Sequence, residues 1–289
     1  MTPAAVTSGY HALRHAVAWL DLSARGRLTA HGRDAARFLH NVTSNDIKKI
    51  APAAGCYAFL LTSKGRIEAD LSIFRLPDPH WYSRAPSSFL IDTEPELREK
   101  VLRHLLKYKV ADQVEFEDVT GQTATIGVEG PSAEAVHLPE GRRIVLPFTV
   151  TGQPGFRVWC AAEMKPEIVA QLEAAGAHPA TPEDARTVRI ENGRPRYGED
   201  ISDQNLPQET QQLQAVSFNK GCYIGQEIVE RIRSQGHVNR KLVRLELDAA
   251  EPPAPGTKLA VDGAEAEVTS AVYSPEFKKV IALAYTRQP

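Results

Sequence analysis

The chain has 289 residues, of which 42% are hydrophobic and 24% are charged, and its formal net charge is −2. This is the composition of a globular protein with two domains, or three if one is small. The small net charge excludes an overall field that would attract nucleic acid or an anionic membrane, so we expect neither as a direct partner. No apolar run reaches the ~20 residues of a transmembrane helix, and the N-terminal stretch lacks a signal-peptide pattern. We therefore expect a cytoplasmic protein.

The three cysteines are Cys56, Cys160 and Cys222. They are far apart, odd in number and form no C-x-x-C pair. This spacing argues against a disulfide framework and against a cysteine-rich metal site built by this chain alone. We expect no stably bound metal.

Helix and strand signals alternate irregularly in the first part of the chain. Apolar spacing predicts a helix over 32–42 and a buried strand over 56–61. The segment 66–74 alternates between apolar and polar residues, which predicts a strand with one polar face carrying Glu68 and Asp70. A carboxylate on such a strand would suit hydrogen bonding to an amine-bearing heterocycle. The alternative is an ordinary solvated strand face.

Two helices carry clear start signals. The first is predicted over 93–109, where Thr93 and Glu96 have the spacing of a capping box. The second is predicted over 181–193, with Thr181 as the cap. Strands are predicted between and around these helices without a regular βαβ alternation, so we expect an α+β fold.

The character of the sequence changes after Gly236. Strand signals dominate to the C-terminus, and the Asp262-Gly263 pair predicts a tight hairpin. We expect three domains with contiguous but approximate borders, the first two of which can exchange segments. They are 1–120, 121–236 and 237–289, the last being a small β-barrel.

The stretch NKGCYIGQE, Asn219 to Glu227, is the least ordinary segment of the chain. Apolar spacing downstream predicts a helix that begins within 221–225 and ends near Gly236. Cys222 would then lie at the helix start, where the helix dipole and Lys220 favour the thiolate. The alternative is a buried cysteine that fills a gap, with glycines required by a turn. The candidate motif consists of Lys220, Gly221, Cys222, Tyr223, Gly225, Gln226 and Glu227.

A third candidate is the glycine-broken segment 189–201, which contains Glu191 and Tyr197 among several arginines and acids. Mixed charge on a loop is usual for solvated surface. An aromatic ring beside a carboxylate and arginines would equally suit a planar ligand with amide-like edges and an acidic tail.

The segment KGCYIGQE resembles the signature of the YgfZ proteins, folate-binding relatives of the glycine-cleavage T-protein, an aminomethyltransferase. Further segments resemble that family in the same order along the chain, so the resemblance covers nearly the whole sequence. These segments are LTAHGRDAARFLHNVTSNDI, LLTSKGRIEADL and ENGRPRYGEDI followed by LPQE.

The resemblance implies a T-protein-like ring of two α+β parts with a small C-terminal β-barrel, and tetrahydrofolate bound in the central opening. It also implies support for the assembly or repair of iron–sulfur clusters in target enzymes, including tRNA-modifying ones. Partners would be folate and iron–sulfur enzymes or assembly factors. By the match, Cys222 and Lys220 are the functional pair, and Asp70, Glu191 and Tyr197 lie at the folate site.

Three positions depart from T-protein. Ala69 stands where T-protein has a second acid beside the position of Asp70. Gln153 and Arg157 replace acids in the segment TGQPGFRVW. These changes argue against aminomethyl transfer with a lipoyl carrier protein, which is the alternative function. A binding-only protein is a further possibility, and the missing G-x-G-x-x-G run excludes a flavin-dependent oxidase.

Overall fold

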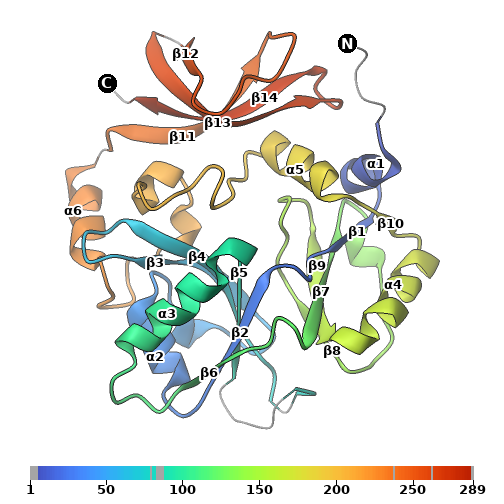
Figure 1. Cartoon of the computed structure of the whole chain (residues 1–289), viewed down its shortest axis with the longest axis vertical. Coiled ribbons are helices and arrows are strands. Elements are labelled where there is room, and N and C mark those ends of the chain that lie inside the picture. Colours follow the sequence, from blue (N-terminus) through green and yellow to red (C-terminus); the bar gives the residue numbers. More distant parts are fainter. Residues whose placement is uncertain (1–5, 79, 83–87, 237, 262, 288–289) are drawn as a thin grey trace. The chain divides into compact units, whose positions relative to one another are not determined.

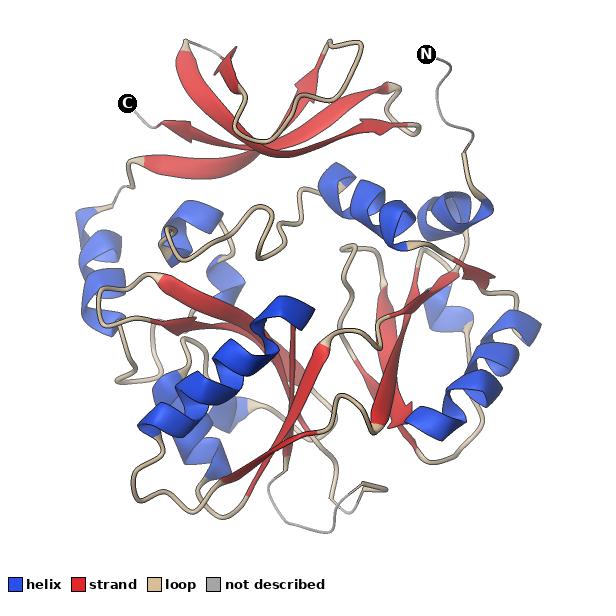
Figure 2. Cartoon of the chain, viewed as in Figure 1, coloured by secondary structure: helices blue, strands red, loops and turns tan. Residues whose placement is uncertain are grey.

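The computed structural model describes residues 6–78, 80–82, 88–236, 238–261 and 263–287 and has an α+β architecture (Figures 1 and 2). The chain forms two compact units, each assembled from separate stretches. The first unit contains Met1–Leu22, Ala124–Asp200 and Leu242–Pro289, and the second unit contains Ser23–Thr123 and Ile201–Lys241.

The second unit is built on a five-stranded sheet with the order β3-β4-β5-β2-β6. Its strands are β2 (Gly26–His31), β3 (Gly55–Leu61), β4 (Ile67–Arg75), β5 (Phe89–Thr93) and β6 (Glu115–Asp118). Its helices are α2 (Ala35–Val42), η1 (Ile47–Lys49), η2 (Pro95–Leu97), α3 (Arg98–Tyr108), η5 (Pro207–Thr210), η6 (Leu213–Ala215) and α6 (Gln226–Gln235). The strands β3 and β4 pair antiparallel and form a hairpin around the turn 62–65.

The polar face of β4 is largely buried, which excludes the alternative of an ordinary solvated strand face. Asp70 is 8% exposed and Ser72 is 2% exposed. Helix α3 contributes to this burial, because Nδ1 of its His104 lies 2.9 Å from a carboxylate oxygen of Glu68. The alternating pattern identified the strand correctly, but the helix that covers its polar side comes from elsewhere in the sequence.

The predicted capping role of Thr93 is wrong. Thr93 is the last residue of β5, and its hydroxyl donates to the carbonyl oxygen of Asp70 at 2.8 Å. The turn η2 comes next, and α3 begins only at Arg98. A hydrogen bond across the sheet therefore replaces the expected local cap.

The first unit contains a second five-stranded sheet, with the order β10-β1-β7-β9-β8. Its strands are β1 (Ala18–Asp21), β7 (Thr123–Glu129), β8 (Arg143–Leu146), β9 (Gly155–Ala161) and β10 (His178–Pro179). Its helices are α1 (Ser8–His15), η3 (Ala133–Ala135), η4 (Ala162–Met164), α4 (Lys165–Ala174) and α5 (Pro182–Glu191). The predicted start of α5 is confirmed, since Thr181 and Asp184 form a reciprocal capping box.

A four-stranded C-terminal sheet has the order β11-β14-β13-β12 (Figure 1). Its strands are β11 (Arg240–Leu247), β12 (Lys258–Val261), β13 (Ala264–Ser274) and β14 (Lys279–Arg287). A buried cluster joins Ile190 of α5 to Val272 and Ile281 of this sheet. The predicted hairpin is present, because Val261 pairs with Ala264 across it and Gly263 has φ of +80°. Asp262 lies outside the described residues.

The two compact units differ from the contiguous borders at 120 and 236. Residues 6–22 belong with 124–200, because β1 pairs antiparallel with β7 through Ala18 and Glu129. Residues 201–241 belong with 23–123. Each unit therefore depends on pairings between distant segments, which local sequence patterns do not reveal.

Candidate functional site

Cys222 is exposed on a loop of the second unit, residues 219–225, which we call the Cys222 loop. Helix α6 begins at Gln226, with Gly225 as its N-cap residue. The predicted position of Cys222 at the helix start is therefore wrong, although the predicted end at Gly236 is confirmed. The alternative of a buried, gap-filling cysteine is also excluded by the exposure of this side chain.

Lys220 is buried, with 9% of its surface exposed. Its ammonium donates to the carbonyl oxygens of His40, Thr43 and Asn45, the last two at 2.5 and 2.9 Å. Burial lowers the pKa of Lys220 to about 8, an effect that Asp46 opposes. The Lys220 ammonium is therefore bound by backbone carbonyl groups.

Tyr223 and Gln226 secure the other side of the loop. Tyr223 is buried, and its ring centroid lies 4.9 Å from Nζ of Lys220. The Tyr223 backbone N–H donates to Oε1 of Gln226 at 3.2 Å. Glu227 is exposed in the first turn of α6, where the helix dipole favours an acid. Burial raises the pKa of Tyr223, and Glu230 adds to the effect.

The two motif glycines have different surroundings. Gly221 has φ of +93°, and a Cβ there would meet no atom within 4 Å. Gly225 has φ of +83°, and a Cβ there would lie 2.5 Å from the carbonyl oxygen of Thr62 and 3.2 Å from Cα of Gly65. Glycine at 225 therefore permits the β3–β4 turn to approach the backbone closely, whereas glycine at 221 serves the loop conformation.

Asp70 of β4 has one satisfied and one unsatisfied carboxylate oxygen. Its Oδ2 accepts from the Tyr57 hydroxyl at 2.8 Å, and its buried Oδ1 makes no hydrogen bond within the described residues. Burial raises the pKa of Asp70 to about 6, and Glu94 contributes in the same direction, whereas Tyr57 and Arg25 oppose the shift. A buried carboxylate oxygen without a donor fits the N–H of a heterocyclic ligand.

Asparagine at position 70 should make stability less dependent on pH. The pKa of Asp70 in the folded protein lies above its ordinary value of 3.8, so its stabilising contribution is complete below pH 4 and is lost as pH rises through 6. We expect the free energy of unfolding of Asp70→Asn, relative to that of wild type, to increase by up to about 3 kcal/mol between pH 4 and pH 7.5. Urea unfolding at several pH values measures this gain.

Ser72→Ala, on the same face of β4, is the control for this experiment because Ser72 does not titrate in this range. Its difference from wild type should be independent of pH. Parallel stability profiles for Asp70→Asn and wild type would contradict the burial argument.

Asp70 and the Cys222 loop are connected within the second unit. Nζ of Lys220 donates to the carbonyl oxygen of Asn45, and Nδ2 of Asn45 donates to the carbonyl oxygen of Tyr57 at 2.8 Å. Tyr57 in turn binds Asp70. Asn45 lies in the segment LTAHGRDAARFLHNVTSNDI, which resembles the family, but no local pattern marks Asn45 or Tyr57 as a functional residue.

Glu191 and Tyr197 lie in the first unit. Glu191 is buried, and its Oε1 accepts from the hydroxyls of Tyr10 at 2.6 Å and Ser274 at 2.5 Å. Burial raises the pKa of Tyr10, and the hydrogen bond to Glu191 adds to this effect. Glu191 thus joins α1, α5 and β13, and Tyr197 is buried as well. Their contact with folate stays a prediction.

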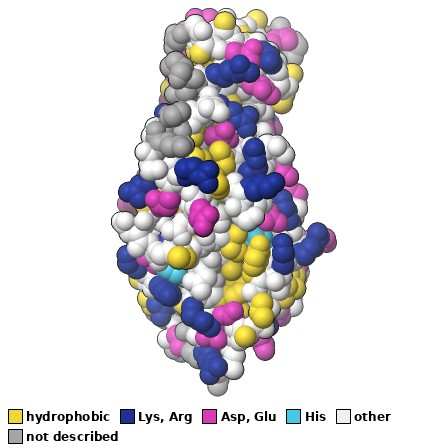
Figure 3. All heavy atoms as spheres, turned by 90° about the vertical axis from the view of Figure 1, so that its left-hand side faces the viewer, with side chains coloured by type: hydrophobic (Ala, Val, Ile, Leu, Met, Phe, Trp, Pro, Cys, Tyr) yellow, Lys and Arg dark blue, Asp and Glu magenta, His cyan; other side chains and the backbone are white. Residues whose placement is uncertain are grey.

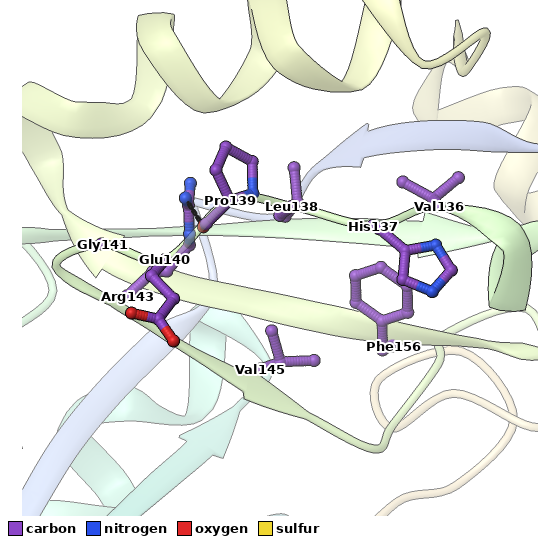
Figure 4. A pocket seen from close by; sticks show the side chains of 9 residues that line it. All are labelled: Val136, His137, Leu138, Pro139, Glu140, Gly141, Arg143, Val145 and Phe156. Atoms are coloured by element: carbon purple, nitrogen blue, oxygen red, sulfur yellow. Dashed lines mark hydrogen bonds between the residues drawn. The ribbon is translucent and has the colours of Figure 1, made fainter.

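A cavity of about 550 Å³ in the first unit is separate from all these residues (Figure 4). The loop before β8 contributes most of its lining, together with two residues of β8 and one of β9. The lining residues are Val136, His137, Leu138, Pro139, Glu140, Gly141, Arg143, Val145 and Phe156. None of the predicted site residues is among them.

Basic and acidic side chains are interspersed over the face drawn in Figure 3, in keeping with the net charge of −2. Within the described residues, no three His, Cys, Asp or Glu side chains group in a way that could hold a metal ion. No helix in that part of the chain is long and apolar enough to span a bilayer.

Comparisons with known proteins match this architecture. The GCVT N-terminal domain matches residues 2–138, and the glycine cleavage T-protein C-terminal barrel domain matches residues 240–289. The aminomethyltransferase of Symbiobacterium thermophilum is 31% identical over 97% of this chain and 81% of its own length. That of a Thermoanaerobacter species is 27% identical over 96% of this chain and 80% of its own length.

A solved structure shares the fold. The glycine cleavage system aminomethyltransferase T from Bartonella henselae superposes with a TM-score of 0.85 at 19% identity, covering 99% of this chain and 82% of that chain. The predicted α+β, T-protein-like fold is therefore confirmed. The sequence matches show that the chain belongs to the aminomethyltransferase family of glycine cleavage T-proteins.

Proposed function

We propose that the chain binds tetrahydrofolate, with Asp70 as a contact to an N–H group of the pterin. The observation that carries this proposal is the buried Oδ1 of Asp70, which has no donor within the described residues. Membership of the aminomethyltransferase family supports a folate-type ligand. Bound tetrahydrofolate would supply a nitrogen that accepts a one-carbon group, and Asp70 would orient that ring system.

We further propose that Cys222 supports the assembly or repair of iron–sulfur clusters in target enzymes, including tRNA-modifying ones. Of the three cysteines, Cys222 is exposed, Cys160 is buried and Cys56 is partly buried. Burial raises the pKa of Cys56 to about 12, which keeps that thiol neutral. A single thiolate does not complete the four-ligand set of a cluster, so Cys222 would contribute to a shared site or act by thiol chemistry.

Aminomethyl transfer with a lipoyl carrier protein is the second candidate. The comparisons support it more directly than the iron–sulfur role, because the relatives bear the name aminomethyltransferase. Two residues of this chain argue against it, because each stands where T-protein has an acid. Arg157 is buried with its guanidinium carbon 5.1 Å from the ring centroid of Phe148, and Ala69 is buried on the opposite side of β4 from Asp70.

Three variants separate the ligand site from the thiol. We expect Asp70→Asn to weaken tetrahydrofolate binding at least ten-fold by calorimetry, about 1.4 kcal/mol, because an amide replaces the accepting carboxylate. Cys222→Ser should bind normally but should fail to restore iron–sulfur enzyme activity in a deletion strain. Cys56→Ser is the matched thiol control and should behave as wild type in both assays.

Each outcome decides between the candidates. Unchanged binding by Asp70→Asn would contradict the ligand site. Full complementation by Cys222→Ser would overturn the thiol role. Product formation by wild type from tetrahydrofolate and an aminomethyl-lipoyl carrier would establish the second candidate, particularly if Cys222→Ser were equally active.

A further inference from the structure

We propose that Lys220 is a positioning residue, which clamps the base of the Cys222 loop to the C-terminal end of α2 and takes no part in proton transfer. The inference rests on the proposed role of Cys222 and deepens it. It assigns Lys220 a structural role in holding the loop, which the sequence motif alone does not indicate.

The acceptors of the Lys220 ammonium lie at the end of a helix. His40 is in the last turn of α2, Thr43 is its C-cap residue and Asn45 follows in the next turn. Carbonyl groups at a helix C-terminus lack partners within the helix and carry the negative end of its dipole. A lysine that is 175 to 180 residues distant in the sequence satisfies three carbonyls in this region.

The main chain of Lys220 is held as well. Nε2 of His40 donates to the carbonyl oxygen of Lys220 at 2.9 Å, and Nδ1 of His40 lies 3.2 Å from Oδ1 of Asp46. His40 is itself buried. Lys220 and His40 therefore exchange hydrogen bonds through both side chains and both carbonyl groups, which fixes the position and the direction of the backbone at Lys220.

Within the Cys222 loop, the two residues between Lys220 and Tyr223 are exposed to solvent. Lys220 on one side and Tyr223 on the other are buried, whereas Gly221 and Cys222 between them are exposed. All three N–H groups of the ammonium have carbonyl acceptors, so none is directed to a reacting group. The arrangement presents the thiol at a defined position on the surface.

Hydrogen exchange with mass spectrometry tests the clamp in the full-length protein. We expect Lys220→Met to accelerate exchange at least ten-fold in both 219–224 and 40–46, because one side chain joins these segments. Lys48→Met is the matched control, since it removes an exposed positive charge from the same region without touching these carbonyls. It should exchange like wild type.

A gentler variant covers the case in which Lys220→Met does not fold. His40→Leu keeps the three contacts of the Lys220 ammonium and removes the hydrogen bond to the Lys220 carbonyl together with the contact to Asp46, and we expect about a three-fold acceleration in 219–224. Unchanged exchange in either folded variant would overturn the clamp. Loss of complementation by Lys220→Met with wild-type exchange would show that Lys220 acts chemically. If Cys222→Ser complements fully, the proposed function fails, but the exchange result still decides the clamp.

Discussion

Asp200→Ala should lower the free energy of unfolding by about 3–5 kcal/mol, the range for removing one partner of a buried ion pair. Asp200 is 3% exposed, and all its acceptor capacity is used. Its Oδ1 accepts from the hydroxyls of Thr269 and Ser270, both at 2.6 Å. Its Oδ2 accepts from Nη1 of Arg189 at 2.7 Å and from the backbone N–H of Arg196 at 3.0 Å.

Removal of this carboxylate leaves a buried guanidinium short of one partner and takes the acceptor from the Ser270 hydroxyl, whereas the Thr269 hydroxyl keeps the carbonyl oxygen of Leu283 at 3.1 Å. The damage falls on the first unit, where α5, the segment after it and β13 meet at Asp200. Urea unfolding followed by tryptophan fluorescence measures the loss. Asp203→Ala, at an exposed site, is the control and should change stability by less than about 0.5 kcal/mol. A loss below about 1 kcal/mol for Asp200→Ala would contradict the described network.

Alanine at Gly225 should be far more damaging than alanine at Gly221. Both glycines have positive φ, so either substitution costs about 1 kcal/mol of backbone strain. At Gly225 the new Cβ would also lie 2.5 Å from the carbonyl oxygen of Thr62 and 3.0 Å from Cβ of Leu61. These atoms belong to the β3–β4 hairpin and do not move aside easily. Overpacking adds about 1–3 kcal/mol, for a total of about 3 kcal/mol.

Gly221→Ala is the matched control for this comparison, since it has the same backbone conformation and open space around the Cβ. Equal losses of stability for the two variants in urea unfolding would contradict the close approach of the hairpin at Gly225. A larger loss of stability for Gly225→Ala than for Gly221→Ala would show that Gly225 is required for packing and Gly221 for the backbone conformation.

Features set by neighbouring residues could be predicted from the sequence. The start of α5 depends on Thr181 and Asp184, which are three residues apart, and this cap is present. The strand β4 and the hairpin before β13 follow from equally local signals. The family resemblance supplied the T-protein-like fold, which the comparisons confirm, whereas the YgfZ branch stays a prediction.

Features set by distant residues could not be predicted. The helix expected at Cys222 begins later because Gly225 adopts a left-handed conformation against the β3–β4 turn. The charge expected beside the thiol is bound instead to carbonyls 175 to 180 residues away. The donor-free oxygen of Asp70 results from tertiary burial, which an alternating pattern does not show. The candidate residues could thus be named from sequence, but their environments could not.

The interleaving of the two units also determines the order in which the protein can be completed during synthesis. The second unit has all its residues once the ribosome has passed Lys241, whereas the first unit needs β14. Tyr10 and Ser274 both donate to Glu191, so segments that are made far apart in time close the same hydrogen-bond network. Strand β1 can pair with β7 and β10 once Pro179 has been made, whereas the network at Glu191 is completed only when Ser274 of β13 emerges.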